Sequence, residues 1–216
     1  MESHALQPSL PRLNEPAPDF EAVSTQGTIK LSNYRGKWVV LFSHPADFTP
    51  VCTTELTEFA RRQPDFKKAD AQLIGLSVDS VYSHIAWIRN MEQHFGVKID
   101  YPLVADLDTK VSELYGMIHP GASSTATVRC VFVIDDEGLV RAMVYYPMTN
   151  GRNVDEILRV LQALQLNKSK GVATPEGWRP GQKVIVPAPV TVPAAEERVK
   201  DPNVEITDWY FGKRAA

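Results

Sequence analysis

Several kinds of residue are scarce in this sequence, and each scarcity excludes a class of protein. Only 2 of the 216 residues are cysteines, so no framework of structural disulfides can form. No block of Lys and Arg occurs and the formal net charge is -3, so nucleic-acid binding is not predicted. Apolar stretches without charge, such as 38–46 and 184–195, are far shorter than the roughly 20 apolar residues of a membrane helix. These absences favour a globular protein that acts on a small molecule.

The first residues also lack the features of a secretory signal. Residues 1–11 have no charged lead-in, no apolar core and no small-residue cleavage site. We therefore expect a cytoplasmic protein in a reducing compartment, where cysteines stay as thiols. The predicted organisation is a leader at 1–13, one main domain at 14–167 and a separate arm at 168–216.

Three uninterrupted apolar runs predict strands that are buried on both faces of a sheet, at 38–42, 73–78 and 128–134. Segments with helical spacing of apolar residues lie between these runs and after them. The alternation of strand and helix predicts an α/β layer fold with parallel strands and right-handed crossovers. The sequence Asp-Asp-Glu-Gly at 135–138 predicts a turn into an antiparallel strand at 139–145.

Two of the predicted helices have definite buried stripes. In the helix that follows the second strand, we expect the buried side chains to be Val81, Ile85, Ile88 and Phe95. A last helix begins after Asn153, which is a suitable capping residue. Its buried stripe is predicted to consist of Val154, Ile157, Leu158, Leu161 and Leu164.

The arm at 168–216 differs in character from the rest of the chain. Residues 169–216 hold six of the 16 prolines and show no clear helical period. Their apolar segments, 184–186 and 209–211, do not suffice for a core of the arm's own. We therefore expect the arm to lie on another surface, such as that of a partner subunit, in a homodimer or a higher homo-oligomer.

The segment around Cys52 contains the residues that a reactive thiol requires. Thr49 is a favoured N-cap residue and Pro50 suits the first helical position, so a helix should begin here. Cys52 then lies in the first turn, where unpaired backbone N–H groups and the positive end of the helix dipole favour a thiolate. The alternative is that Cys52 is a small buried hydrophobic residue, as most free cysteines are.

Arg129 is the one cation within the apolar run 128–134. A buried charge without a partner is costly, so an anion should lie nearby. The Cys52 thiolate is one candidate, and Glu55, three residues further along the same helix, is another. Alternatively, Arg129 lies at the end of the strand and reaches water.

Pro45, Thr49 and Cys52 stand in the spacing P-x-x-x-T-x-x-C, which resembles that of the peroxiredoxins. The flanking residues 42–45 and 53–56 resemble the one-cysteine, long-tailed branch of that family, known as the alkyl hydroperoxide reductase/thiol-specific antioxidant family. The similarity runs from about Pro16 through the arm, where Val172-Ala173-Thr174-Pro175 and Trp178 match the branch. The resemblance implies a thioredoxin-like, three-layer α/β fold with an extended C-terminal arm.

The resemblance also implies roles in the reduction of hydrogen peroxide and organic hydroperoxides. Cys52 would be the nucleophile that becomes a sulfenic acid. Thr49 would bind the peroxide, Pro45 would shield the thiolate, and Arg129 would stabilise the negative charge. Glu55 would orient Arg129.

His44 and Arg152 also match positions of this branch, as residues that bind substrate. Without the resemblance, the sequence supports equally well that His44 is a packing residue beside the strand end. Arg152 reads equally well as a solvated residue at the start of a helix.

Two departures from the branch pattern limit what is expected. The arm contains no cysteine, so the oxidised Cys52 would need an external thiol such as thioredoxin or glutathione. Adjacent strand residues point to opposite faces, so if Arg129 faces Cys52, Cys130 points away from it and is not expected to be an internal partner. The serine setting of the lipase activity found in mammalian members is also missing at 35–38, so that activity is not expected.

Other functions are weakly supported by the sequence. A disulfide exchanger needs C-x-x-C, which Cys52 does not begin, and no signature of a cysteine hydrolase occurs. The five histidines show no metal-ligand spacing, so neither a metal nor another cofactor is predicted. The remaining alternative is a peroxide sensor or an oligomeric chaperone on the same fold.

Overall fold

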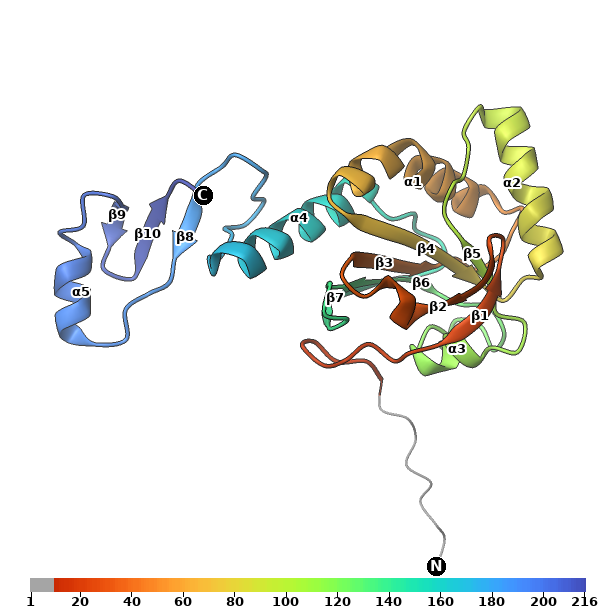
Figure 1. Ribbon diagram of the computed structural model, residues 1–216, viewed down its shortest axis with the longest axis horizontal. Coiled ribbons are helices and arrows are strands. Elements are labelled where there is room, and N and C mark those ends of the chain that lie inside the picture. Colours follow the sequence, from red (N-terminus) through yellow and green to blue (C-terminus); the bar gives the residue numbers. More distant parts are fainter. Residues whose placement is uncertain (1–9) are drawn as a thin grey trace, which may run out of the picture. The chain divides into compact units, whose positions relative to one another are not determined.

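The computed structural model describes residues 10–216, shown in Figure 1. Most of the predicted leader at 1–13 therefore lies outside the described residues. The chain divides into two compact units, one ending at Val154 and the other beginning at Asp155. Each unit is described separately below.

The first unit is built around a seven-stranded sheet with the order β2-β1-β5-β4-β3-β6-β7. Its central strands match the three apolar runs predicted from the sequence. The bounds are β1 Glu21–Ser24, β2 Gly27–Lys30, β3 Trp38–Ser43, β4 Ala71–Ser77, β5 Leu103–Ala105, β6 Arg129–Ile134 and β7 Val140–Tyr146, with a short 3-10 helix, η1, at Leu31–Tyr34.

Strand direction in this sheet is mixed. Strands β3 and β4 are parallel, as expected, and β5, which the sequence did not predict, is parallel to β4. The predicted hairpin that joins β6 to β7 is confirmed. However, β6 runs antiparallel to β3, which the sequence did not predict. An apolar run that is buried on both faces identifies a central strand but carries no information about its direction.

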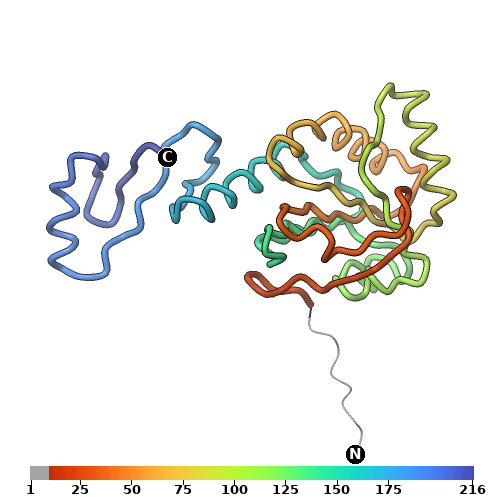
Figure 2. The backbone as a smooth tube through the Cα atoms, viewed as in Figure 1, coloured from red at the N-terminus to blue at the C-terminus, as the bar shows by residue number. Residues whose placement is uncertain are grey.

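Helices cover both faces of the sheet, which gives the predicted three layers (Figures 1 and 2). Helix α1, Pro50–Lys68, packs on the face that carries Phe42, whose ring stacks on that of Phe59 at 4.1 Å between centroids. Helix α2, Val81–Phe95, contacts α1 and β5. Helix α3, Lys110–Leu114, covers the opposite face. The fold is the thioredoxin-like one that the sequence predicted.

The buried stripe of α2 differs from the predicted one. His84, Trp87 and Met91 are buried, whereas Ile85 and Phe95 are 43% and 49% exposed. The prediction selected apolar residues by spacing and so passed over a polar side chain. His84 is buried because both of its ring nitrogens find partners inside the protein.

The second unit contains more structure than the sequence predicted. It comprises α4 Val154–Lys170, β8 Val184–Val186, α5 Val192–Arg198, β9 Glu205–Asp208 and β10 Phe211–Arg214. The three strands form an antiparallel sheet with the order β8-β10-β9. Helix α4, which the sequence analysis assigned to the main domain, groups with this unit. The predicted stripe of α4 is buried from Val154 to Leu161.

A small core holds part of the second unit together. Val172, Trp178 and Val184 are buried and pack with Ala163 of α4. Because Ala163 lies outside residues 168–216, this is not a core of the arm's own, and the arm lies on another surface here as expected. That surface is α4, which the sequence analysis had assigned to the main domain. Trp209 and Tyr210 remain 45% and 55% exposed.

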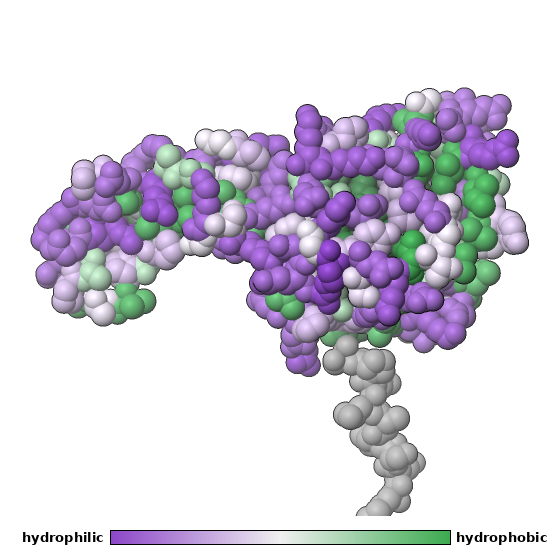
Figure 3. Space-filling model, viewed as in Figure 1, coloured by the Kyte–Doolittle hydropathy of each residue, from purple (hydrophilic) through white to green (hydrophobic). Residues whose placement is uncertain are grey.

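Among residues 10–216, no helix combines the length and the apolar character that a bilayer crossing requires. Polar residues cover much of the face shown in Figure 3, with apolar residues scattered among them.

Candidate active site

Cys52 lies in the first turn of α1, as predicted, and its exposed fraction is 0%. Thr49 has extended backbone angles at the N-cap position, and Pro50 begins the helix. The first helical hydrogen bond runs from the N–H of Thr53 to the carbonyl of Thr49. Cys52 therefore precedes the first satisfied amide, and its sulfur lies near the positive end of the helix dipole.

The Thr49 side chain does not cap the helix. Its hydroxyl donates to the carbonyl of Ala46 at 2.9 Å and accepts no hydrogen bond from the first turn. The expected N-cap position is thus right, but the expected side-chain bond is not formed. The hydroxyl oxygen is held in the loop that leads to Cys52, within residues 44–49.

The same loop has an unusual backbone at Phe48, where φ is 54°. This left-handed conformation is rare and strained for a residue with a large side chain. The Phe48 side chain is 56% exposed, and its ring lies 6.1 Å from that of Trp87. Pro45, in contrast, is buried. The loop that precedes Cys52 therefore combines a buried proline with a strained, exposed aromatic residue.

Arg129 contacts both of the anions that the sequence suggested. Its Nη1 lies 3.4 Å from Cys52 Sγ and 2.6 Å from Glu55 Oε2. Its Nε and Nη2 donate to the carbonyl of Met148 at 2.9 and 2.7 Å. Arg129 is only 2% exposed, so the alternative in which it reaches water is wrong. These four contacts fix the guanidinium beside the sulfur.

Glu55 joins Arg129 to a second buried arginine. Arg152 donates to Glu55 through its backbone N–H, its Nε and its Nη2, at 2.7, 2.8 and 2.8 Å. Burial alone would raise the pKa of Glu55, but the hydrogen bonds and charge of Arg152, together with the charge of Arg129, lower it. Glu55 is therefore an ionised carboxylate that both guanidinium groups share.

Arg152 is itself buried, so the reading in which it is solvated is also wrong. Its Nη1 donates to the carbonyl of Cys130 at 2.7 Å, and its guanidinium lies 5.5 Å from the centre of the Phe42 ring. Hydrogen bonds, an ion pair and a cation–π contact thus compensate its burial.

Cys130 occupies a different environment, although it adjoins Arg129 in sequence. It belongs to the apolar cluster on the other face of the sheet, together with Val128, Phe132 and Ile134. Burial raises the pKa of the Cys130 thiol to about 12, despite a hydrogen bond with Ser43 and the charge of Arg152. The structure therefore separates the two thiols by the thickness of the sheet, as strand alternation predicts.

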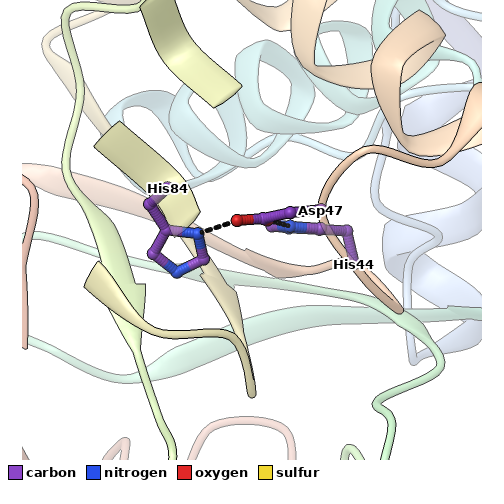
Figure 4. Close-up of side chains that lie close together, drawn as sticks. All are labelled: His44, Asp47 and His84. Atoms are coloured by element: carbon purple, nitrogen blue, oxygen red, sulfur yellow. Dashed lines mark hydrogen bonds and ion pairs between the residues drawn. The ribbon is translucent and has the colours of Figure 1, made fainter. Parts of the chain in front are cut away.

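His44 belongs to a buried cluster that the sequence did not reveal, shown in Figure 4. Its Nε2 lies 2.9 Å from Asp47 Oδ1, and Asp47 Oδ2 lies 2.8 Å from Nδ1 of His84. One ligand atom from each residue lies within 4.8 Å of the others, an arrangement that could also hold a metal ion. The short spacing from His44 to Asp47 was a possible signal. His84 gave none, because it lies far away in the sequence.

Comparisons with known proteins agree with this fold and site. Residues 13–143 match the AhpC/TSA family, and residues 163–201 match the C-terminal domain of 1-Cys peroxiredoxin. A peroxiredoxin of Aquifex aeolicus is 52% identical over 217 residues, which cover 95% of this chain and 97% of that protein. A peroxiredoxin of Thermoplasma volcanium is 52% identical over 199 residues, which cover 92% and 96%.

Two solved structures are similar along nearly the whole chain. A yeast mitochondrial 1-Cys peroxiredoxin has a TM-score of 0.84 and 40% identity, covering 95% of this chain and 99% of that one. A cysteine-to-serine mutant of the peroxiredoxin 6 of Arenicola marina also has a TM-score of 0.84, with 37% identity and coverage of 95% and 98%.

The fold, the buried thiol and these matches define a peroxidase of the oxidoreductase class that works through a cysteine. The chain belongs to the AhpC/TSA family of peroxiredoxins, with the C-terminal domain of the 1-Cys members.

Proposed function

We propose that this peroxiredoxin reduces hydrogen peroxide and organic hydroperoxides at Cys52. The observation that carries the proposal is the charge balance around the sulfur. Arg129 and Arg152 share the single carboxylate of Glu55, which leaves one unit of positive charge in a buried site. The Nη1 of Arg129 lies 3.4 Å from Sγ, so a thiolate at Cys52 neutralises this charge.

The proposed reaction uses each group of the site. The thiolate attacks the terminal oxygen of the peroxide, so that the S–O bond forms while the O–O bond breaks. The leaving oxygen takes a proton and departs as water or an alcohol, and Cys52 becomes a sulfenic acid. Arg129, oriented by Glu55, stabilises the developing negative charge. Thr49, Arg152 and His44 position the substrate, and Pro45 shields the sulfur.

The sulfenic acid is recycled by an external thiol in this proposal. The thiol displaces water to form a mixed disulfide with Cys52, and a second thiol then releases the reduced enzyme. Cys130 is a poor internal partner because its pKa is raised and it faces away from Cys52. The similar yeast structure concerns thiol resolution through glutathione and thioredoxin systems. We extend that class of reductant to this chain and place the reaction in a reducing cytoplasm.

A homodimer or higher homo-oligomer completes the proposal. Val190, Val192, Val199 and Trp209 line an apolar groove of about 540 Å³ in the second unit. A second copy of the chain is the proposed occupant of this surface. Removing residues 187–216 should lower the number of subunits per particle, calculated from the mass measured by light scattering, and an unchanged number of subunits would contradict the proposal.

Steady-state turnover tests the proposed function. Peroxide consumption is followed with thioredoxin, glutathione or dithiothreitol as the reductant. Repeated turnover with at least one of them is expected. A single stoichiometric oxidation with all three would instead favour the peroxide sensor, and protection of an unfolding client without peroxide consumption would favour the chaperone.

A further inference from the structure

The contacts of the cluster of His44, Asp47 and His84 indicate which of its ring nitrogens carry a hydrogen. His84 Nε2 lies 3.1 Å from the carbonyl of Val104, which can only accept, so Nε2 carries a hydrogen. Burial alone would raise the pKa of Asp47, but hydrogen bonds and charges from His44 and His84 lower it, so the carboxylate is ionised and can only accept. Nδ1 of His84, at 2.8 Å from this carboxylate, must therefore carry a hydrogen as well. In this geometry, both ring nitrogens of His84 are placed to donate hydrogen bonds.

The same reasoning fixes the tautomer of His44. Its Nε2 faces the Asp47 carboxylate at 2.9 Å and must donate. Its Nδ1 is buried and meets no hydrogen-bond partner among residues 10–216. Burial lowers the pKa of His44, although Asp47 acts in the opposite direction, so the ring is neutral. His44 therefore has a lone pair on Nδ1, because an N–H there would be buried without an acceptor.

The alternation of side chains along β3 places His44 on the side of the thiol. The backbone N–H of His44 donates to the carbonyl of Leu76, so the bonding to β4 continues past the end of β3. Residues two apart along an extended strand share a face of the sheet, so His44 lies on the face of Phe42. The ring of Phe42 stacks on that of Phe59 in α1, the helix that carries Cys52 in its first turn.

The groups that face His44 come from every neighbouring element. Asp47 lies on its own loop and His84 on α2, while Asp79 follows β4 and accepts from the backbone N–H of Asp47 at 3.0 Å. The ring of Trp87 lies 5.4 Å from that of His44. Asp47, His84 and Asp79 are the charged neighbours that shift the pKa of His44, beside the effect of its burial.

We propose that His84, acting through Asp47, is a positioning residue that holds His44 in its neutral Nε2–H tautomer. The Nδ1 lone pair is then available to accept a hydrogen bond from the O–H of a hydroperoxide beside Cys52. This inference rests on the proposed function, because it names the acceptor that orients the substrate. His84 touches neither the substrate nor the sulfur in this scheme.

Kinetics of His84→Leu provide the first test. Losing one well-placed hydrogen bond to the substrate should raise KM for peroxide about 3- to 10-fold, with a smaller change in kcat. His94→Leu is the matched control, since His94 lies on the same helix and is exposed. An unchanged KM in His84→Leu would overturn the inference.

The pH profile distinguishes positioning from a merely structural role. The acid limb of kcat/KM should report protonation of His44, which removes the lone pair. The His84 charge lowers the pKa of His44, so His84→Leu should move this limb to higher pH. The Asp47 charge raises the same pKa, so Asp47→Asn should move the limb to lower pH. If the acid limb shifted in the same direction in both variants, or in neither, the inference would be overturned.

Nitrogen-15 NMR of the histidine rings reads the tautomer directly. We expect both ring nitrogens of His84 and only Nε2 of His44 to be protonated. Asp47→Asn should keep the His44 tautomer, because an amide can accept from His44 and donate to a neutral His84. A protonated Nδ1 on His44, or stoichiometric zinc that disappears in His84→Leu, would overturn the inference. A wild-type protein without turnover would refute the proposed function and leave this NMR result intact.

Discussion

Cys52 and Cys130 are both fully buried in the first unit, yet their charged and polar neighbours differ. Cys52 lies at a helix N-terminus with a guanidinium 3.4 Å from its sulfur. Cys130 lies among apolar side chains that raise its pKa to about 12. Burial by itself therefore does not distinguish the two thiols, whereas the guanidinium beside Cys52 and the apolar neighbours of Cys130 do.

Replacing each cysteine with serine gives the largest expected difference in peroxide consumption. Cys52→Ser should reduce peroxide consumption to the uncatalysed background, because the nucleophile is lost. Cys130→Ser should keep turnover with an external thiol nearly unchanged, and a hydroxyl in its apolar site should cost about 1–3 kcal/mol of unfolding free energy. Mass spectrometry after peroxide treatment checks the distinction. An abundant Cys52–Cys130 disulfide would contradict the separate roles of the two cysteines.

Arg129→Lys tests how much the fixed guanidinium contributes at Cys52. The lysine keeps the positive charge but cannot bind Cys52, Glu55 and Met148 together. We expect kcat/KM for peroxide to fall about 10²- to 10³-fold, as for the loss of one preorganised donor. Arg141→Lys is a matched control at a half-buried arginine of β7, for which activity should be retained. Equal activity of the two variants would show that charge alone is sufficient.

Glu55→Gln should affect stability more than any change at Cys130. It leaves Arg129 and Arg152 buried without a counter-charge, which should cost about 3–5 kcal/mol in urea unfolding. The pKa of Glu55 is lowered in the folded state, so its contribution is present above pH 4.5 and is lost as the pH falls further. The variant should therefore show a flatter loss of stability in acid. An equally steep loss would contradict the shared ion pair.

The smallest expected effect is the contribution of Cys130 to the loss of unfolding free energy at alkaline pH. Its pKa rises from 9.0 to about 12 on folding, so only the unfolded chain releases this proton between those values. The unfolding free energy should then fall with pH by as much as about 1.4 kcal/mol per unit in that window. Cys130→Ala should remove this component, as measured by urea unfolding at pH 8, 9 and 10. Parallel curves for the two proteins would indicate that Cys130 reaches solvent.

Local sequence was a good guide where local rules decide the structure. The apolar runs predicted the central strands, and Thr49 with Pro50 predicted the start of the helix that carries Cys52. Strand alternation was enough to separate Arg129 from Cys130. These features depend on residues that are adjacent in sequence, so one chain suffices to predict them.

The rest depends on contacts between distant segments. The burial of His84 requires Asp47 from the loop before α1 and the carbonyl of Val104 from β5, and neither is visible from the pattern of α2. The bond from Thr49 to Ala46 replaces a cap that propensity would favour. The small core around Trp178 likewise needs Ala163 of α4. Tertiary partners override local preference at each of these places.

The left-handed backbone at Phe48 has a consequence for the timing of catalysis. In the proposed recycling, a protein thiol must approach a sulfur that is 0% exposed, so we expect the loop that precedes Cys52 to open. If Phe48 relaxes to a right-handed conformation in that step, strain of about 1 kcal/mol is released, which would make the open form about five times more populated than with an unstrained residue. The closed loop thus stores backbone strain at Phe48 that favours opening. We expect this strain to shorten the time that a sulfenic acid at Cys52 waits for its reductant, and with it the time in which a second peroxide can oxidise it further.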